Sequence, residues 1–62
     1  MKYRISLSNG YEQVTYEECT DVQLKDGLLT FWLPVEIEGL VVNYEFSLRQ
    51  SGRRLVIESE VG

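Results

Sequence analysis

Two facing carboxylates are the first residues in this chain whose spacing could support chemistry. Glu45 and Glu58 are expected to face each other across the last of a series of β-hairpins, with Glu36 and Glu60 nearby. Paired carboxylates can divide the roles of general acid and general base when a cleft perturbs one of them. An open, convex sheet face offers no such cleft. The pattern therefore favours solvated surface groups or a contact with a basic partner over catalysis.

The only thiol is a second candidate. Cys19 has no histidine anywhere in the chain to act as its base, and it lies among Glu17, Glu18 and Asp21. Neighbouring carboxylates raise the pKa of a thiol and suppress the reactive thiolate. The pattern predicts a small, half-buried residue at a bend, with no disulfide. No residue of the chain is predicted to be catalytic.

Metal and cofactor sites are not predicted either. A structural zinc site needs four cysteine or histidine ligands, and this sequence has one cysteine and no histidine. An Asp-x-Asp-x-Asp-Gly loop for calcium is also missing from the sequence. We expect no bound metal and no cofactor.

A basic cluster lies at the last predicted hairpin. Arg49, Arg53 and Arg54 could grip a phosphate or a carboxylate, although a soluble hairpin tip is the simpler interpretation. The net charge of the whole chain is −4. Binding to a phosphate backbone needs lysines and arginines that release counterions. Direct binding of nucleic acid is therefore not expected, whereas a basic protein partner is compatible with this charge.

The elements that position these groups are predicted from turn dipeptides. These are Asn9-Gly10, Asp26-Gly27, Glu38-Gly39 and Ser51-Gly52. Asn-Gly and Asp-Gly favour two-residue type I′ turns, in which both central residues have positive φ. Glu-Gly and Ser-Gly are weaker signals, and a longer turn or a bulge is the alternative at Ser51-Gly52. The dipeptides divide the 62 residues into five strands of a single domain, residues 1–62, with no amphipathic helix. The strands are expected near residues 2–8, 11–25, 28–38, 40–50 and 53–61.

Two-residue turns also fix which residues face each other. Apolar residues then meet apolar residues along one face of an antiparallel meander. The expected pairs are Tyr3 with Tyr16 and Ile5 with Val14; Val22 with Phe31 and Leu24 with Leu29; Phe31 with Phe46, Leu33 with Tyr44, Val35 with Val42 and Ile37 with Leu40; and Phe46 with Ile57, Leu48 with Leu55 and Val42 with Val61. On the opposite face, Lys2 is expected to lie across from Glu17.

The first register cannot continue unchanged, because it would turn Glu18 and Thr20 inward. A bend or bulge is therefore predicted across residues 17–20. Pro34 is expected opposite Cys19, where that bend interrupts the ladder, because proline cannot donate a ladder hydrogen bond. An apolar face without a covering helix must curl up or stack. The predicted fold is an all-β, five-stranded antiparallel meander curled into a small barrel, SH3-like or OB-like in size only. The alternative is an open sheet that stacks as a dimer.

Trp32 is the residue most suggestive of a binding surface. Phe31 and Leu33 point inward in the registers on both sides, so alternation places Trp32 on the outer face, next to Asp21 and Glu45. An exposed aromatic residue rimmed by polar groups is typical of a protein interface. The candidate partner-binding residues are Trp32, Glu45, Glu58, Asp21, Glu36 and Glu60. The basic residues Arg49, Arg53 and Arg54 form a secondary candidate site.

These features predict a small, acidic, non-catalytic protein-binding module that docks on a larger, partly basic protein. Small acidic β-proteins of this kind look like inhibitors that phages and mobile elements direct against nucleic-acid-handling proteins, an analogy of size and charge rather than of motif. The N-terminal segment MKYRISLSNG has no continuous apolar stretch, so a cytoplasmic location without membrane contact is expected. A self-associating structural subunit is the alternative function, and a homodimer is compatible with both.

Overall fold

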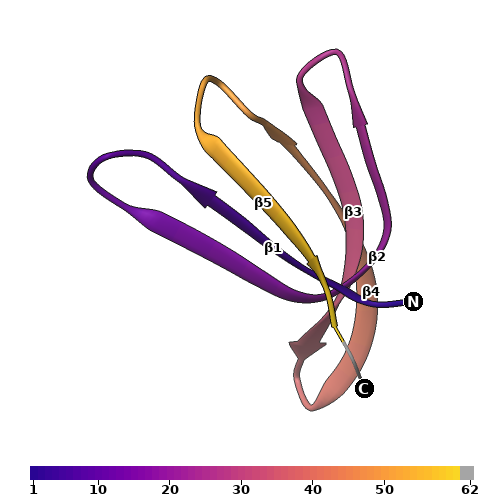
Figure 1. Cartoon of the computed structure of the whole chain (residues 1–62). Helices are drawn as coiled ribbons and strands as arrows, with labels where there is room; N and C mark the ends of the chain where they lie inside the picture. The colour runs from indigo at the N-terminus through magenta and orange to yellow at the C-terminus, as the bar shows by residue number, and fades with distance from the viewer. Residues whose placement is uncertain (61–62) are drawn as a thin grey trace.

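The chain folds into one antiparallel β-sheet of five strands (Figure 1). The computed structural model describes residues 1–60. Its strands are β1 (Tyr3–Ser8), β2 (Gln13–Lys25), β3 (Leu28–Ile37), β4 (Leu40–Arg49) and β5 (Arg54–Ser59). They lie in the order β4-β3-β2-β1-β5, and residues 1–60 contain no helix. The all-β class and the antiparallel pairing of β1 to β4 with their sequence neighbours are confirmed.

Three of the turn dipeptides form two-residue turns with positive φ at both central residues. The values are 53° and 76° at Asp26 and Gly27, 51° and 82° at Glu38 and Gly39, and 51° and 74° at Ser51 and Gly52. The predicted register is confirmed along the whole of β3 and β4, and it is confirmed for β2 and β3 next to their turn. Positive φ at both central residues is what a two-residue type I′ turn requires.

The Asn9-Gly10 dipeptide forms a different turn. The Asn9 side-chain oxygen accepts hydrogen bonds from the backbone N–H groups of Tyr11 (2.8 Å) and Glu12 (2.9 Å). The Asn9 backbone N–H donates to the Glu12 carbonyl oxygen at 3.0 Å. A side-chain oxygen that mimics a backbone acceptor stabilises a longer connection. The first hairpin therefore has a loop spanning residues 9–12 in place of the predicted two-residue turn.

The longer loop shifts the β1–β2 register by two residues. Ile5 lies opposite Tyr16, not opposite Val14 as predicted. Because side chains alternate with a period of two, this shift leaves the same residues facing the core. The predicted partner of Lys2 was also wrong, since its Nζ lies 3.7 Å from Oε1 of Glu18.

The two kinds of turn provide a matched prediction for glycine. Gly27 has a φ of +76° while Gly10 has no positive φ, and an added Cβ meets nothing within 4 Å at either position. Gly27→Ala is expected to destabilise the fold by about 1–2 kcal/mol, because the left-handed region disfavours a Cβ. Gly10→Ala is expected to be neutral or to stabilise by up to about 1 kcal/mol. Urea denaturation of both variants measures the difference, and equal losses would contradict it.

Strand β5 departs from the predicted meander. It pairs with β1, so that Leu55 lies opposite Leu7 and Ile57 lies opposite Ile5. The predicted pairs of Leu48 with Leu55 and of Phe46 with Ile57 are wrong, and the pair of Val42 with Val61 lies outside the described residues. Strands β4 and β5 are the two free edges of the sheet. The sheet is therefore not closed into the predicted barrel.

The turn before β5 forms as predicted, but the strands on its two sides separate. The backbone N–H of Gln50 donates to the Gly27 carbonyl oxygen at 3.0 Å, which holds the end of β4 against the β2–β3 turn. The Arg53 N–H donates to the Gln50 carbonyl at 2.9 Å and closes the turn. The alternating residues of β5 fit beside β1 as well as beside β4. Sequence alternation alone therefore does not select the partner strand.

Strand β2 bends in its middle, as predicted. Glu18 and Asp21 have φ values of 59° and 52°, and the registers with β1 and with β3 both shift there. The part before the bend pairs with β1 and the part after it pairs with β3. Val22, predicted opposite Phe31, falls within the second shift. Bulges of this kind bend a strand and increase its twist, so the two halves of the sheet fold toward each other (Figure 1).

The core fills the space between these halves. Its fully buried residues are Ile5, Leu7, Cys19, Leu29 and Phe31. The ring of Phe31 packs against Tyr16, with centroids 5.2 Å apart, and stacks on Phe46 at 5.9 Å. All of these apolar residues except Cys19 belong to the predicted inner face. Cys19 is fully buried, where the sequence predicted a half-buried residue.

Candidate functional site

Trp32 lies on the outer face of β3, and 38% of its surface is exposed. Across the sheet it has Glu45 on one side, as predicted, and Thr20 on the other. Asp21 was expected in place of Thr20, but the bulge in β2 shifts the register by one residue. The structure therefore brings Trp32 and Glu45 together and does not place Asp21 in direct register with them.

Beyond Trp32, strand β3 loses one of its neighbours. The β2–β3 ladder ends at Thr20 and Trp32, so residues 33–37 of β3 pair with β4 alone. Pro34 lies in this two-stranded part, where a missing N–H on the side away from β4 disrupts no ladder. Its predicted partner was wrong, because Cys19 pairs with Tyr3. We refer to residues 35–44, which project from the sheet in Figure 1, as the hairpin arm.

The hairpin arm is unusually apolar for an exposed segment. Leu40 and Val41 at its tip are each 70% exposed, and Ile37, Val42 and Tyr44 are 41%, 42% and 48% exposed. Ile37, Leu40, Val42 and Tyr44 were predicted to be core residues, and that prediction is wrong. The other half of the sheet does not extend far enough to cover them.

An open groove runs beside Trp32 on the outer face. It is lined by Lys2, Glu18, Thr20, Pro34, Val41 and Asn43. The ion pair between Lys2 and Glu18 lies among these residues. The groove thus connects the cross-strand neighbour of Trp32 to the exposed Val41 of the hairpin arm. The lining of the groove is mixed, because Pro34 and Val41 are apolar and the other four residues are polar or charged.

The predicted acidic face is divided between the two edges of the sheet. Because β5 pairs with β1, Glu58 lies opposite Arg4 and far across the strand order from Glu45 on β4. The predicted facing of Glu45 and Glu58 is therefore wrong. Glu36, opposite Val41, remains on the same hairpin as Glu45.

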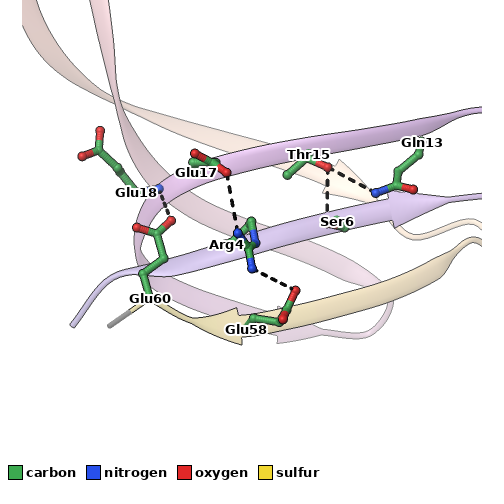
Figure 2. Close-up of polar contacts among 8 residues, drawn as sticks. All are labelled: Arg4, Ser6, Gln13, Thr15, Glu17, Glu18, Glu58 and Glu60. Atoms are coloured by element: carbon green, nitrogen blue, oxygen red, sulfur yellow. Dashed lines mark hydrogen bonds and ion pairs between the residues drawn. The ribbon is translucent and has the colours of Figure 1, made fainter. Parts of the chain in front are cut away.

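Glu58 and Glu60 have structural partners (Figure 2). The Arg4 guanidinium lies 3.5 Å from Oε1 of Glu58 and 3.9 Å from Oε1 of Glu17, so it bridges the strands on both sides of β1. Oε1 of Glu60 accepts a hydrogen bond from the Glu18 backbone N–H at 2.9 Å, at the bulge of β2. These carboxylates stabilise the β5–β1–β2 part of the sheet. Glu36 and Glu45 form no ion pair within residues 1–60.

The basic candidates are separated as well. The Arg53 guanidinium donates to the carbonyl oxygens of Gln50 (3.1 Å from Nε) and Arg49, so it caps the turn before β5. Arg49 remains on β4 beside Leu28, whereas Arg54 is carried to the β1 side of the sheet. The structure brings Arg49 and Arg53 together and leaves Arg54 apart.

Burial makes Cys19 a poor nucleophile. Desolvation, with a smaller contribution from the charge of Glu60, raises the pKa of Cys19 from 9.0 to about 11. We therefore expect an aromatic disulfide reagent to label this thiol only after unfolding, at neutral pH. Rapid labelling of the folded protein would contradict the burial.

The same pKa shift predicts how stability depends on pH. A thiol whose pKa is raised on folding binds its proton more tightly in the folded state. The stabilisation that protonated Cys19 gives the folded state is fully present below pH 9, and it is lost as the pH rises toward 11.

Within the described part of the chain, no three histidine, cysteine, aspartate or glutamate side chains are grouped as metal ligands. Nor do residues 1–60 contain a helix long and apolar enough to cross a membrane. No protein-family model, curated protein or solved structure matches the chain.

Sequence reasoning did not predict that the apolar residues of the hairpin arm are exposed. The signal that could have revealed it is the length of the third hairpin compared with its neighbours. Strands β3 and β4 have ten residues each, but β1 and β5 have six. Strands this short leave the far end of the longer hairpin uncovered.

Proposed function

We propose that this protein is a non-catalytic protein-binding module. Its contact surface comprises Trp32, the adjacent groove and the outer side of the hairpin arm, with Glu36 and Glu45 at the border. The observation that carries the proposal is the exposure of Trp32 (38%) and Val41 (70%) on the outer face of this hairpin, with Glu45 opposite Trp32 and Glu36 opposite Val41. Exposed apolar patches rimmed by polar groups mark interaction sites in folded proteins.

Trp32 supplies the anchor in this proposal. Tryptophan is enriched among the residues that dominate binding energies, because it buries a large surface and loses little conformational entropy. Pro34 and Val41, the two apolar residues that line the groove, extend the apolar contact. Glu36 and Glu45, which have no ion pair among residues 1–60, add a negative border that suits a basic partner.

The original set of partner-binding candidates is narrowed accordingly. Glu58 and Glu60 stabilise β5 and the β2 bulge, and they lie at the opposite edge of the sheet from β4. We assign the contact to Trp32, Glu36 and Glu45. Glu58, Glu60 and Asp21 are not required for it.

The proposal is tested by binding measurements on surface variants. A partner would be captured from the native host with the tagged protein, purified, and titrated in solution. Trp32→Ala is expected to weaken its binding by at least about 30-fold, which corresponds to a hot-spot loss of about 2 kcal/mol. Glu45→Lys is expected to weaken binding less in high salt than in low salt, because salt screens the charge.

Glu12→Lys is the matched control for Glu45→Lys. Glu12 is exposed in the 9–12 loop, and its reversal changes the net charge by the same amount. Circular dichroism should show that all three variants remain folded. Unchanged binding by Trp32→Ala and Glu45→Lys would overturn the proposal, as would an equal loss with Glu12→Lys.

A narrower form of the proposal is inhibition of a nucleic-acid-handling protein in the cytoplasm. It rests on small size and negative charge, which would allow the chain to compete with a phosphate backbone for a basic surface. Displacement of nucleic acid from the purified partner by this protein would support it. The alternative of self-association is favoured by a separate observation, the free edge of β4.

A further inference from the structure

Strand β4 is an edge strand with few of the features that usually protect an edge; Glu45 and Arg49 are its only charged residues. It runs for ten residues, Leu40 to Arg49, with no bulge in its register with β3 and no proline or lysine. No Cα atom of β5 lies within 8 Å of β4, so the turn between them does not cover this edge. Long, flat edges with apolar side chains are templates for pairing with another strand.

The backbone groups that point from this edge follow from the turn. Ile37 and Leu40 flank a two-residue turn and form a hydrogen-bonded pair, so hydrogen-bonded and non-hydrogen-bonded positions alternate from there. The β4 residues that direct their N–H and C=O groups toward β3 are Leu40, Val42, Tyr44, Phe46 and Leu48. Those that direct them toward the open edge are Val41, Asn43, Glu45, Ser47 and Arg49.

The far end of the edge is already occupied. The carbonyl oxygen of Arg49 points outward by this alternation, and it accepts a hydrogen bond from the Arg53 guanidinium. An added strand can therefore use the outward groups of Val41, Asn43, Glu45 and Ser47, but not those of Arg49. Among residues 1–60, none of these four N–H groups donates a hydrogen bond to the backbone of a turn or loop.

A second copy of β4 fits this edge in one register better than in the others. When two copies of β4 pair antiparallel about a two-fold axis, the residues that direct their backbone groups to the open edge must lie opposite each other. The axis must therefore pass beside one residue of β4, which then lies opposite the same residue of the second copy. An axis at Glu45 places two glutamates opposite each other and requires the occupied Arg49 carbonyl. An axis at Phe46 also requires that carbonyl, and an axis at Asn43 shortens the ladder. An axis at Tyr44 avoids all three problems.

The Tyr44 axis also matches the side chains. On the inner face it places Leu40 opposite the second copy's Leu48 and Val42 opposite its Phe46. On the outer face it places Asn43 opposite Glu45, with no like charges in register. Just past the paired segment, Arg49 lies beside Gly39 and Glu38 of the other copy, so opposite charges meet at both ends.

We propose that the protein forms a two-fold homodimer in which the β4 strands pair antiparallel about Tyr44 and join the two sheets. Four hydrogen-bonded residue pairs would supply about eight backbone hydrogen bonds. The pairing brings the exposed inner-face residues of the hairpin arm, Leu40, Val42 and Tyr44, beside apolar residues of the second copy. The outer face that carries Trp32 stays open on both protomers, so the dimer presents two copies of the proposed binding surface.

Cysteine cross-linking tests the register on the purified protein without any partner. Tyr44→Cys places two thiols opposite each other in a non-hydrogen-bonded pair, where the Cα atoms are about 4.5 Å apart and a disulfide can form. Val42→Cys is the matched control, because Val42 shares the inner face but lies opposite Phe46 and not opposite itself. Under mild oxidation, Tyr44→Cys is expected to give a covalent dimer and Val42→Cys is not. Cys19 is buried and does not compete.

Charge substitutions at Asn43 give a second test. In this register, Asn43→Lys creates two opposite-charge pairs with Glu45 and Asn43→Glu creates two like-charge pairs. The dimer dissociation constant is expected to fall about 2- to 30-fold with lysine and to rise by a similar factor with glutamate. Thr15→Lys and Thr15→Glu, at an exposed position on β2, change the net charge equally and should leave the constant unchanged.

Sedimentation of the wild-type protein from micromolar to millimolar concentration completes the experiment. A monomer–dimer equilibrium supports the proposal. A strict monomer at millimolar concentration overturns it, and growth into species larger than a dimer overturns the closed two-fold pair. Equal cross-linking of Tyr44→Cys and Val42→Cys, or equal responses to lysine and glutamate at Asn43, would overturn the register.

Discussion

Phe31→Ala is expected to remove much or all of the free energy of unfolding of this protein. Phe31 is fully buried, and its ring contacts those of Tyr16 and Phe46 at the centre of the core. Truncating a buried phenylalanine costs about 3–5 kcal/mol. A domain of 62 residues has a total stability of about 3–9 kcal/mol at the usual 0.05–0.15 kcal/mol per residue. The loss therefore consumes much or all of the stability, which urea denaturation monitored by circular dichroism would detect.

Phe46→Ala is the control for this prediction. Phe46 stacks on Phe31 and has the same chemistry, but it lies on the edge strand and is only half-buried. Phe46→Ala is expected to lower the free energy of unfolding less than Phe31→Ala does, because Phe46 buries less apolar surface. If Phe46→Ala destabilised the protein as much as Phe31→Ala, the assignment of the core to the space between the two halves of the sheet would be wrong.

Ser6→Pro is the second substitution with a large expected effect. Ser6 lies in β1 between Thr15 of β2 and Val56 of β5, so β1 is a central strand. In a central strand, a backbone N–H points to one neighbour or the other, and proline removes that hydrogen bond. We expect a loss on the order of 3 kcal/mol, measured as a lower urea midpoint and melting temperature.

Asn43→Pro provides the comparison. The N–H of Asn43 points to the free edge of β4, so proline there should leave the β3–β4 ladder in place and cost much less. At concentrations where the protein is monomeric, the two variants should therefore differ clearly in stability. Tolerance of Ser6→Pro would contradict the pairing of β1 with β5.

The placement of the proposed binding surface depends on this same strand order. With β5 beside β1, the carboxylates of Glu58 and Glu60 stabilise one end of the sheet, while Glu36 and Glu45 accompany Trp32 at the other. A meander would have gathered all four on one acidic face. The structure leaves a smaller acidic border beside Trp32 and Val41, which shifts the proposed contact from charge toward apolar burial.

Several features of the candidate site follow from local sequence. Asp26-Gly27 and Glu38-Gly39 set two-residue turns, and the turn geometry fixes the register of β3 and β4. The outward position of Trp32, its pairing with Glu45 and the alignment of Phe31 with Phe46 all follow from that register. The bend of β2 was also predictable, because a straight strand would have carried Glu18 and Thr20 into the core. In each case the deciding interactions lie within one hairpin or one strand.

The sequence by itself thus determined an all-β chain of five antiparallel strands, the residues on each face of β3 and β4, and the bend in β2. Only the tertiary structure decided that β5 pairs with β1, that the sheet stays open, and that the inner side of the hairpin arm is exposed. The physical reason is that alternation specifies a face but not a neighbour, so Leu55 and Ile57 fit either edge equally well. The choice depends on where the bent halves of the sheet bury the most apolar surface, and that becomes defined only when the whole chain is folded.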